Sequence, residues 1–177
     1  MSSIAPIQIL ITVMKPLFFA IALSLGLLTA CMTTPDYPDE PVIEFKSLSD
    51  DFLNQGVLGP DPIDSFTIVF SFTDGDGDIS LLEGQDTSNI YVYDSRQPTV
   101  SQNFRVPTIL DNELGKDISG EISLKLAAPC CIFSNNTACY PNPLEPRDTF
   151  SYLIEVRDRA GHFSNRIQTP PIVLKCD

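Results

Sequence analysis

Three aspartates at alternate positions, separated by glycines, are the residues of this chain best suited to chemistry. Asp74, Asp76 and Asp78 stand in the run Asp-Gly-Asp-Gly-Asp. Two unit charges about 5 Å apart repel by roughly 3 kcal/mol at an effective dielectric of about 20, so these carboxylates favour a cation or full solvation. Gly75 and Gly77 let the backbone curl so that alternate carboxylates converge. The spacing predicts a calcium site, and the alternative is a solvated, glycine-rich turn.

The acidic run does not match an EF-hand loop. Counted from Asp74, an EF-hand has Gly at its sixth position and Glu at its twelfth, where this chain has Ile79 and Gln85. The EF-hand match therefore fails, and what remains is a generic Asp-x-Asp-x-Asp cluster.

The sequence favours a non-catalytic protein. His162 is the only histidine, so a Ser-His or Cys-His mechanism would have to use it. No Gly-x-Ser-x-Gly nucleophile elbow occurs. The residues leave open a pair of acids across a cleft, as in glycosidases.

The elements that position these residues are predicted to be short strands. Hydrophobic residues alternate most clearly at 66–72, where Phe66, Ile68, Phe70 and Phe72 share one face. We expect an all-β fold, an immunoglobulin-like β-sandwich of about seven strands, and the alternatives are another sandwich or a barrel. The expected strands are 42–48, 64–73, 90–93, 119–127, 150–158 and 162–175, with one more within 104–110.

This topology predicts further ligands for the cation. Asp74 follows one core-facing row of residues and Asp158 follows another, and both rows finish at the same end of the sandwich. We expect Asp158 to join the three aspartates. Glu40, before the first strand, or Glu83, further along the loop, would complete the six to eight oxygen ligands that calcium takes.

The N-terminus is typical of an exported protein. Residues 16–28 form an apolar run after Lys15, as in a signal peptide, and the run is shorter than the roughly 20 residues of a membrane-spanning helix. Leu28-Thr29-Ala30-Cys31 resembles the bacterial lipobox, which implies cleavage before Cys31 and acylation of its thiol. We expect a lipoprotein signal peptide over 1–30, an extended tether over 31–40 and the sandwich over 41–177. The alternatives are a plain secretory signal or an uncleaved anchor.

The other four cysteines are an even number in a chain predicted to be exported, which favours two disulfides. Adjacent residues of an extended segment point to opposite sides, so one of Cys130 and Cys131 is expected to bond to Cys139 and the other to Cys176. Zinc is the alternative, but no histidine is nearby and adjacent cysteines suit tetrahedral coordination poorly.

Two short motifs carry a family resemblance. Residues 156–165 resemble the last hairpin of bacterial immunoglobulin-like repeats, which often read Asp-x-Ala-Gly-Asn followed by Ser, with His162 here in place of Asn. Together with residues 70–79 and the lipobox, the chain is similar to uncharacterised Bacteroidetes-type lipoproteins. The resemblance implies an immunoglobulin-like fold and a cell-envelope location, and it carries over no catalytic residue.

Composition and charge limit the kinds of partner that this protein can bind. Of 177 residues, 11 are Lys or Arg and 23 are Asp or Glu, a net charge of −12, so nucleic acid is excluded because phosphate binding needs basic surface. We expect an outer-membrane lipoprotein, held at the membrane by its lipid anchor, that serves as a structural or interaction module for an envelope protein. The alternative is glycan binding through Tyr91 and Tyr93, although the chain has no Trp.

Overall fold

The computed structural model describes residues 36–56, 64–82, 84, 87–108, 115–134, 138–140, 142 and 144–176. The chain divides into two units, residues 1–34 and residues 35–177, and every described residue belongs to the second. The expected signal peptide, the expected lipidation site Cys31 and the expected ligand Glu83 lie outside the described residues. What was predicted for them stays a prediction.

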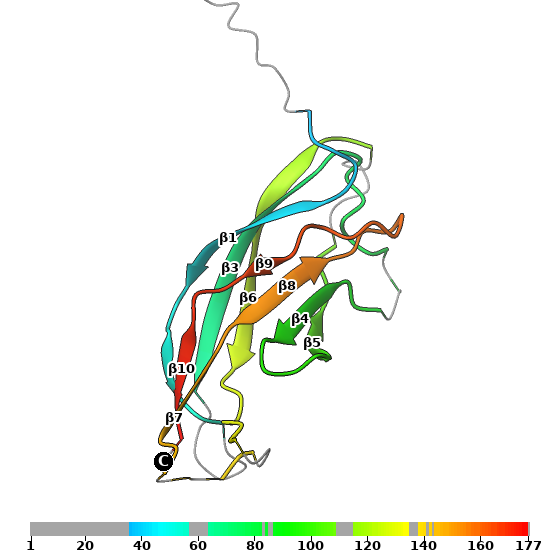
Figure 1. Ribbon diagram of the computed structural model, residues 1–177. Helices are drawn as coiled ribbons and strands as arrows, with labels where there is room; N and C mark the ends of the chain where they lie inside the picture. The colour runs from blue at the N-terminus through cyan, green and yellow to red at the C-terminus, as the bar shows by residue number, and fades with distance from the viewer. Residues whose placement is uncertain are drawn as a thin grey trace, which may run out of the picture. The chain divides into compact units, whose positions relative to one another are not determined.

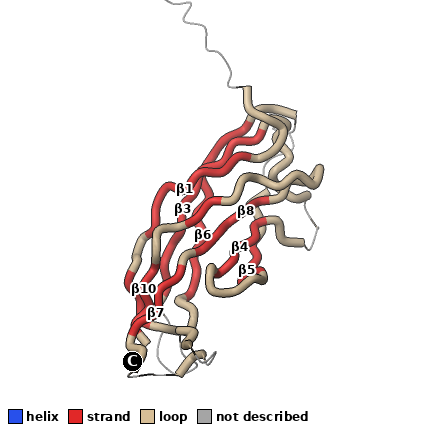
Figure 2. Tube along the Cα trace, in the orientation of Figure 1, coloured by secondary structure: helices blue, strands red, loops and turns tan. Residues whose placement is uncertain are grey.

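All regular secondary structure in the described residues is β-strand, which confirms the all-β prediction (Figure 2). The strands in chain order are β1 (Val42–Leu48), β2 (Phe52–Asn54), β3 (Ser65–Asp74), β4 (Ile90–Asp94), β5 (Val100–Phe104), β6 (Ile118–Ala127), β7 (Arg147–Phe150), β8 (Tyr152–Val156), β9 (Ile167–Gln168) and β10 (Ile172–Lys175).

The strands form three sheets (Figure 1). One sheet has the order β1-β3-β6 and a second has the order β5-β4-β8-β9, both antiparallel throughout. The third has the order β2-β10-β7, in which β10 runs parallel to β2 and antiparallel to β7. The longest ladder joins β3 to β6 without a break in register, from Ser65 opposite Ala127 to Asp74 opposite Ile118.

One hydrophobic core lies between these sheets, as in a β-sandwich. On β3 the four residues Phe66, Ile68, Phe70 and Phe72 are all buried, as their alternation predicts. Contact between the sheets is direct, because the ring of Phe66 stacks on that of Tyr152 of β8 with centroids 6.0 Å apart.

Most predicted strands occur where the alternation placed them, and two are interrupted. β1, β3, β4 and β6 agree with the expected ranges to within about a residue at each end. The range 150–158 begins inside β7 and continues as β8 after a break at Ser151, and 162–175 contains the two short strands β9 and β10. Pro170 and Pro171 separate β9 from β10, because proline has no N–H to donate to a ladder.

The strand expected within 104–110 is wrongly placed. β5 ends at Phe104 instead of beginning there, and it pairs with β4. Residues 105–108 belong to no strand. The backbone N–H of Val106 donates to the side chain of Asn89 instead of to a ladder, and Pro107 has none to donate.

Two disulfides join the cysteines as the sequence predicted, and the structure decides which of the adjacent pair goes where. Cys130 is bonded to Cys139 and Cys131 to Cys176. The Cys131–Cys176 bond ties the segment after β6 to the end of β10, at the end of the domain that we call the disulfide end.

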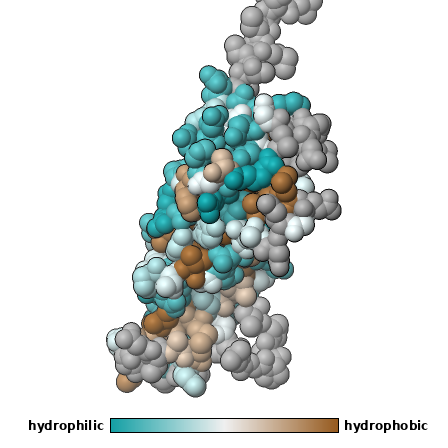
Figure 3. Space-filling model, turned by 90° about the vertical axis from the view of Figure 1, so that its right-hand side faces the viewer, coloured by the Kyte–Doolittle hydropathy of each residue, from teal (hydrophilic) through white to brown (hydrophobic). Residues whose placement is uncertain are grey.

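The surface differs between the two ends of the domain. Figure 3 shows mainly hydrophilic residues towards the end where β3 finishes, and more apolar colour towards the disulfide end. Three of the exposed large hydrophobic residues, Phe52, Tyr140 and Leu144, belong to β2 and the segment around the disulfides.

Candidate metal centre

Asp74 is an acidic residue in a core position. It is the last residue of β3, and the alternation that buries Phe66 to Phe72 continues to it because side chains two apart on a strand share a face. Its exposed fraction is 0%. A carboxylate buried this completely needs a charged or hydrogen-bonding partner.

The structure brings the three predicted aspartates together. They lie in residues 74–78, which we call the acidic loop. Asp74, Asp76 and Asp78 each offer one carboxylate oxygen, and these three oxygens lie within 4.8 Å of one another. Calcium binds oxygen at about 2.3–2.6 Å, so two ligands on opposite sides of the ion are about 5 Å apart. The cluster therefore has the dimensions of a single cation site.

Each of these carboxylates has a buried oxygen without a hydrogen bond. The atoms are Asp74 Oδ1, Asp76 Oδ1 and Asp78 Oδ1, and none has a partner among the described residues. The second oxygen of Asp74 accepts the N–H of Ile79 at 2.8 Å, and that of Asp78 accepts the N–H of Ala160 at 3.0 Å. Backbone amides thus orient two of the side chains and leave one oxygen of each available to a ligand.

Burial and mutual repulsion favour protonation of Asp74 and Asp78 when no cation is bound. Burial raises the pKa of Asp74 to about 6, against the opposing effect of the Ile79 amide and with added repulsion from Asp76 and Asp78. Burial also raises the pKa of Asp78, and repulsion from Asp158 and Asp76 adds to the shift. The raised pKa values of Asp74 and Asp78 show that the ionised forms of these two side chains are unfavourable. A divalent cation would remove this cost.

Asp158 lies beside the cluster but has other partners. Its charge raises the pKa of both Asp74 and Asp78. Its Oδ1 accepts the N–H groups of Gly161 and His162 at 2.6 and 2.7 Å, and its Oδ2 is 2.9 Å from Nδ1 of His162. Asp158 therefore closes the turn after β8 with the same oxygens that the sequence assigned to a metal.

Two other residues considered from the sequence are not among the converging ligands. Glu40 is exposed and is not among the three residues whose oxygens converge. His162 is exposed, and its hydrogen bond to Asp158 raises the pKa of its imidazole.

The acidic loop is covered by the segment that precedes β1, a contact the sequence did not reveal. The N–H of Gly75 donates to the carbonyl of Pro38 at 2.9 Å. A Cβ at Gly75 would lie 2.3 Å from the carbonyl oxygen of Tyr37, so this position requires glycine. The N–H of Tyr37 donates to Asp117 at 2.8 Å. Residues 37–38, expected to belong to the tether, are thus held against the loop.

A second connection fixes the loop from the other side. The carbonyl of Asp76 accepts the N–H of Gly115 at 2.6 Å, and the carbonyl of Asp78 accepts the N–H of Arg159 at 3.2 Å. The acidic loop therefore joins three segments far apart in sequence, before β1, before β6 and after β8.

The two tyrosines considered for glycan binding are engaged by neighbouring side chains. The hydroxyl of Tyr93 donates to Glu155 at 2.5 Å, and the guanidinium of Arg166 lies 4.6 Å from the centre of its ring. The ring of Tyr91 is 6.0 Å from that of Phe163. Part of their aromatic surface is therefore covered by the protein itself.

Comparisons with protein-family models, with curated proteins and with solved structures find no match for this chain. None of the described residues forms a helix that is both long and apolar enough to cross a membrane.

Proposed function

We propose that this chain is a non-catalytic, calcium-binding module of the bacterial cell envelope, in which calcium fixes the junction between the lipid-anchored tether and a β-sandwich. The observation that carries the proposal is the set of three buried carboxylate oxygens, one each from Asp74, Asp76 and Asp78, that have no hydrogen bond within the described residues. Three such acceptors in one cluster are costly, because each buried acceptor without a partner costs about 1–3 kcal/mol and a charged one more.

Calcium fits the cluster better than zinc or magnesium does. The converging ligands are all oxygens, whereas zinc sites in proteins mostly use His and Cys. Magnesium requires near-ideal octahedral geometry, while calcium tolerates irregular sets of six to eight oxygens. The three carboxylates supply part of such a set, and water or carbonyl oxygens would supply the rest.

The role we assign to the ion is mechanical. With the charge of the acidic loop neutralised, the loop keeps the conformation in which Gly75 contacts Tyr37 and Pro38. The chain that leads to the anchor then leaves the sandwich from a fixed point. This favours a structural or interaction module that holds its partner, an envelope protein, at a defined position.

The immunoglobulin-like assignment is supported by strand order. The sheets β1-β3-β6 and β5-β4-β8-β9 correspond to the strands A-B-E and C′-C-F-G of an immunoglobulin-like sandwich, in which C and F are neighbours and B pairs with both A and E. The parallel pairing of β2 with β10 adds a short edge strand beside G.

The location at the outer membrane depends on the lipid anchor proposed at Cys31. Full-length protein is expected to fractionate with membranes, and Cys31→Ser is expected to release it or leave it unprocessed. If the variant and the parent chain carry no acyl group and fractionate alike, the anchor is contradicted.

Thermal unfolding of the full-length protein in detergent, with millimolar calcium and with EDTA, tests the proposed function. A ligand at 100 times its dissociation constant stabilises the folded state by about 2.7 kcal/mol, so calcium is expected to raise the midpoint by several degrees. Asp76→Asn should abolish the difference, and Asp50→Asn, an exposed aspartate outside the cluster, should retain it. Coincident curves for the parent protein would contradict calcium binding.

A further inference from the structure

β6 has a free edge. It is the last strand in the order β1-β3-β6, and all ten of its residues pair with β3 on the other side. No described strand pairs with its second side. The ladder with β3 has no register shift and β6 contains no proline, so β6 lacks two of the features by which edge strands avoid further pairing.

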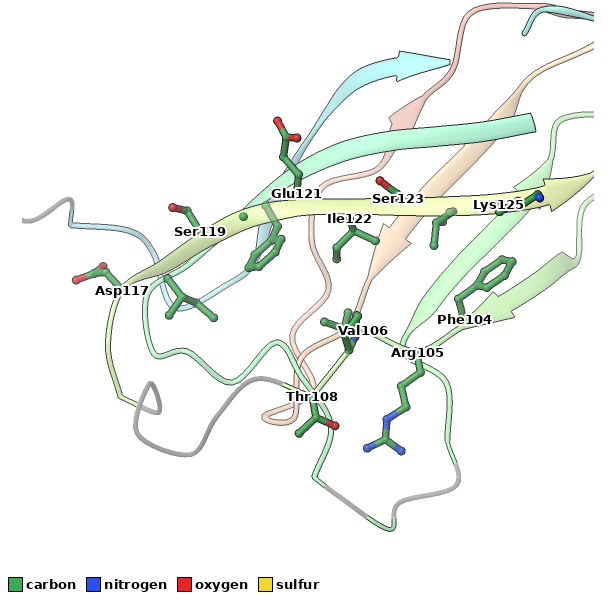
Figure 4. Close-up of a pocket in the computed structure, with 15 residues that line it drawn as sticks. Phe104, Arg105, Val106, Thr108, Asp117, Ser119, Glu121, Ile122, Ser123 and Lys125 are labelled. Carbon is green, nitrogen blue, oxygen red and sulfur yellow. The ribbon is translucent and has the colours of Figure 1, made fainter. Parts of the chain in front are cut away.

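A groove of about 830 Å³ runs along this edge (Figure 4). Consecutive residues 117–125 line it, including those that face the core and those that face solvent. Because both faces of the strand contribute, the wall of the groove is the backbone edge itself. Figure 4 shows Ile122 directed from β6 towards Val106 on the other side, while Glu121 and Ser123 project away. The backbone donors and acceptors of this edge are therefore accessible to an added strand.

The solvent-facing row of β6 carries two opposite charges placed symmetrically. Glu121 and Lys125 are exposed and lie two residues before and two residues after Ser123. No ion pair joins either of them to another described residue. In an antiparallel pair of identical strands with Ser123 opposite itself, Glu121 of each copy faces Lys125 of the other.

We propose that two copies of this chain associate edge to edge through β6, as an antiparallel pair with a two-fold axis at Ser123. The sheet β1-β3-β6 then continues into its symmetry mate, and the interface is isologous. Two reciprocal Glu121–Lys125 pairs form on the outer face. On the inner face Ile122 of one copy lies opposite Leu124 of the other, and both side chains are already buried within their own chain.

The charges select this register and this occupant. Directly opposite residues of an antiparallel ladder have their side chains on the same side of the sheet. The pairing can therefore shift only in steps of two residues, which moves the two-fold axis by one residue. Moving the axis to Ile122 places Glu121 opposite Ser123, and moving it to Leu124 places Lys125 opposite Ser123. Only the axis at Ser123 pairs each carboxylate with an ammonium group. In a protein of net charge −12, two surfaces meet more easily where their charges compensate.

Site-specific cross-linking of the full-length protein in detergent tests the proposal. Ser123→Cys is expected to give a covalent dimer with a short bismaleimide, because facing Cα atoms of an antiparallel pair are about 4.5–5.5 Å apart. Ser119→Cys, on the same face of β6, is the matched control and should not cross-link, because the two copies of residue 119 would be about 27 Å apart. The parent chain, treated in the same way, accounts for any dimer formed through Cys31.

Charge reversal distinguishes a second copy from another extended partner. Lys125→Glu places like charges opposite each other twice and should weaken self-association roughly tenfold in sedimentation velocity. Adding Glu121→Lys restores two opposite-charge pairs between copies and should restore the dimer. A monomer at all concentrations, a dimer that Ser123→Cys does not cross-link, or a double variant that stays monomeric while folded by circular dichroism would each overturn the proposal.

Discussion

Asp74 is where the core of this protein meets its proposed metal site. It occupies the last position of the buried row on β3, and burial raises the pKa of its carboxyl group to about 6. The run Asp-Gly-Asp-Gly-Asp was sufficient to predict that Asp74, Asp76 and Asp78 converge, because glycines at alternate positions permit it. The role of Asp158 was harder to predict. The sequence indicates that Asp158 lies nearby, but not that its carboxylate accepts hydrogen bonds from the backbone N–H groups of its own turn.

The raised pKa of Asp74 makes the stability of the folded state depend on pH. In metal-free protein its pKa is about 6 when folded, against the ordinary value of 3.8 in an unfolded chain, so the folded state holds the proton more tightly. This contribution to stability is fully present below about pH 4 and is lost as the pH rises through about 6. Calcium competes with the proton, so the stabilisation by calcium should grow over the same range.

Urea denaturation from pH 4.5 to 7, with and without calcium, measures this prediction. Asp74→Asn should remove the part of the pH dependence that is due to Asp74, because the amide does not titrate, and leave the part due to Asp78, whose pKa is also raised. A calcium effect of equal size at pH 4.5 and pH 7 would contradict the assignment of Asp74 as a ligand.

Arg96 is predicted to be the most important cation for stability. Its guanidinium contacts Asp94 at 2.5 Å, pairs with Asp148, and lies 4.3 Å from the ring centre of Phe150. Arg96→Met would leave two carboxylates without their cation and should lower the free energy of unfolding by roughly 3–5 kcal/mol. Arg166→Met is the control, since Arg166 is about half exposed and pairs with Glu155, and it should cost about 1 kcal/mol or less. Equal losses in urea denaturation would contradict this ranking.

Strands that bury a regular row of side chains were predictable from the sequence, whereas β2 and β5 were not. β3 and β6 alternate clearly, and their ranges were correct to within about a residue. β5 was misplaced because Val100-Ser101-Gln102-Asn103-Phe104 has no buried row to read, and β2 was not predicted because three residues carry no period. The contact of residues 37–38 with the acidic loop could not be predicted from the sequence. A glycine needed for close approach of another segment, such as Gly75, cannot be distinguished in the sequence from a glycine needed for a turn.

Gly75 is predicted to be the position at which the acidic loop and the segment before β1 depend on each other. In Gly75→Ala the new Cβ would lie 2.3 Å from the carbonyl of Tyr37, so residues 37–38 must move. We expect a loss of about 1–3 kcal/mol in unfolding free energy and faster hydrogen exchange of the Tyr37 amide. Ser71→Ala, on the outer row of β3, should change neither. Unchanged exchange in Gly75→Ala would show that the segment is not held by this contact.

The two ends of the domain are stabilised by different means. The acidic loop gathers three chain segments at one end, and two disulfides close the other. The disulfide end could be predicted from cysteine number and strand order, because the strand order brings the segment after β6 close to the end of β10. The pairing of Cys131 rather than Cys130 with Cys176 depends on which side chain faces the core, and Cys131 is fully buried.

The two disulfides are predicted to contribute unequally. Cys131–Cys176 closes 45 residues and Cys130–Cys139 closes nine. Loop-closure entropy then gives about 4 kcal/mol for the longer loop and about 2.5 kcal/mol for the shorter one. Paired substitutions to alanine, compared by urea denaturation, should rank in this order, and a larger loss from the Cys130–Cys139 pair would contradict it.

Equilibrium dialysis of the full-length protein against radioactive calcium measures directly whether the acidic loop binds an ion. We predict one calcium ion bound per chain at millimolar calcium, the range of extracellular calcium modules. Asp76→Asn should lose this ion and Asp50→Asn should keep it. If the parent protein binds none, or if Asp76→Asn binds as much as the parent, the acidic loop does not hold a calcium ion and the proposed metal site is contradicted.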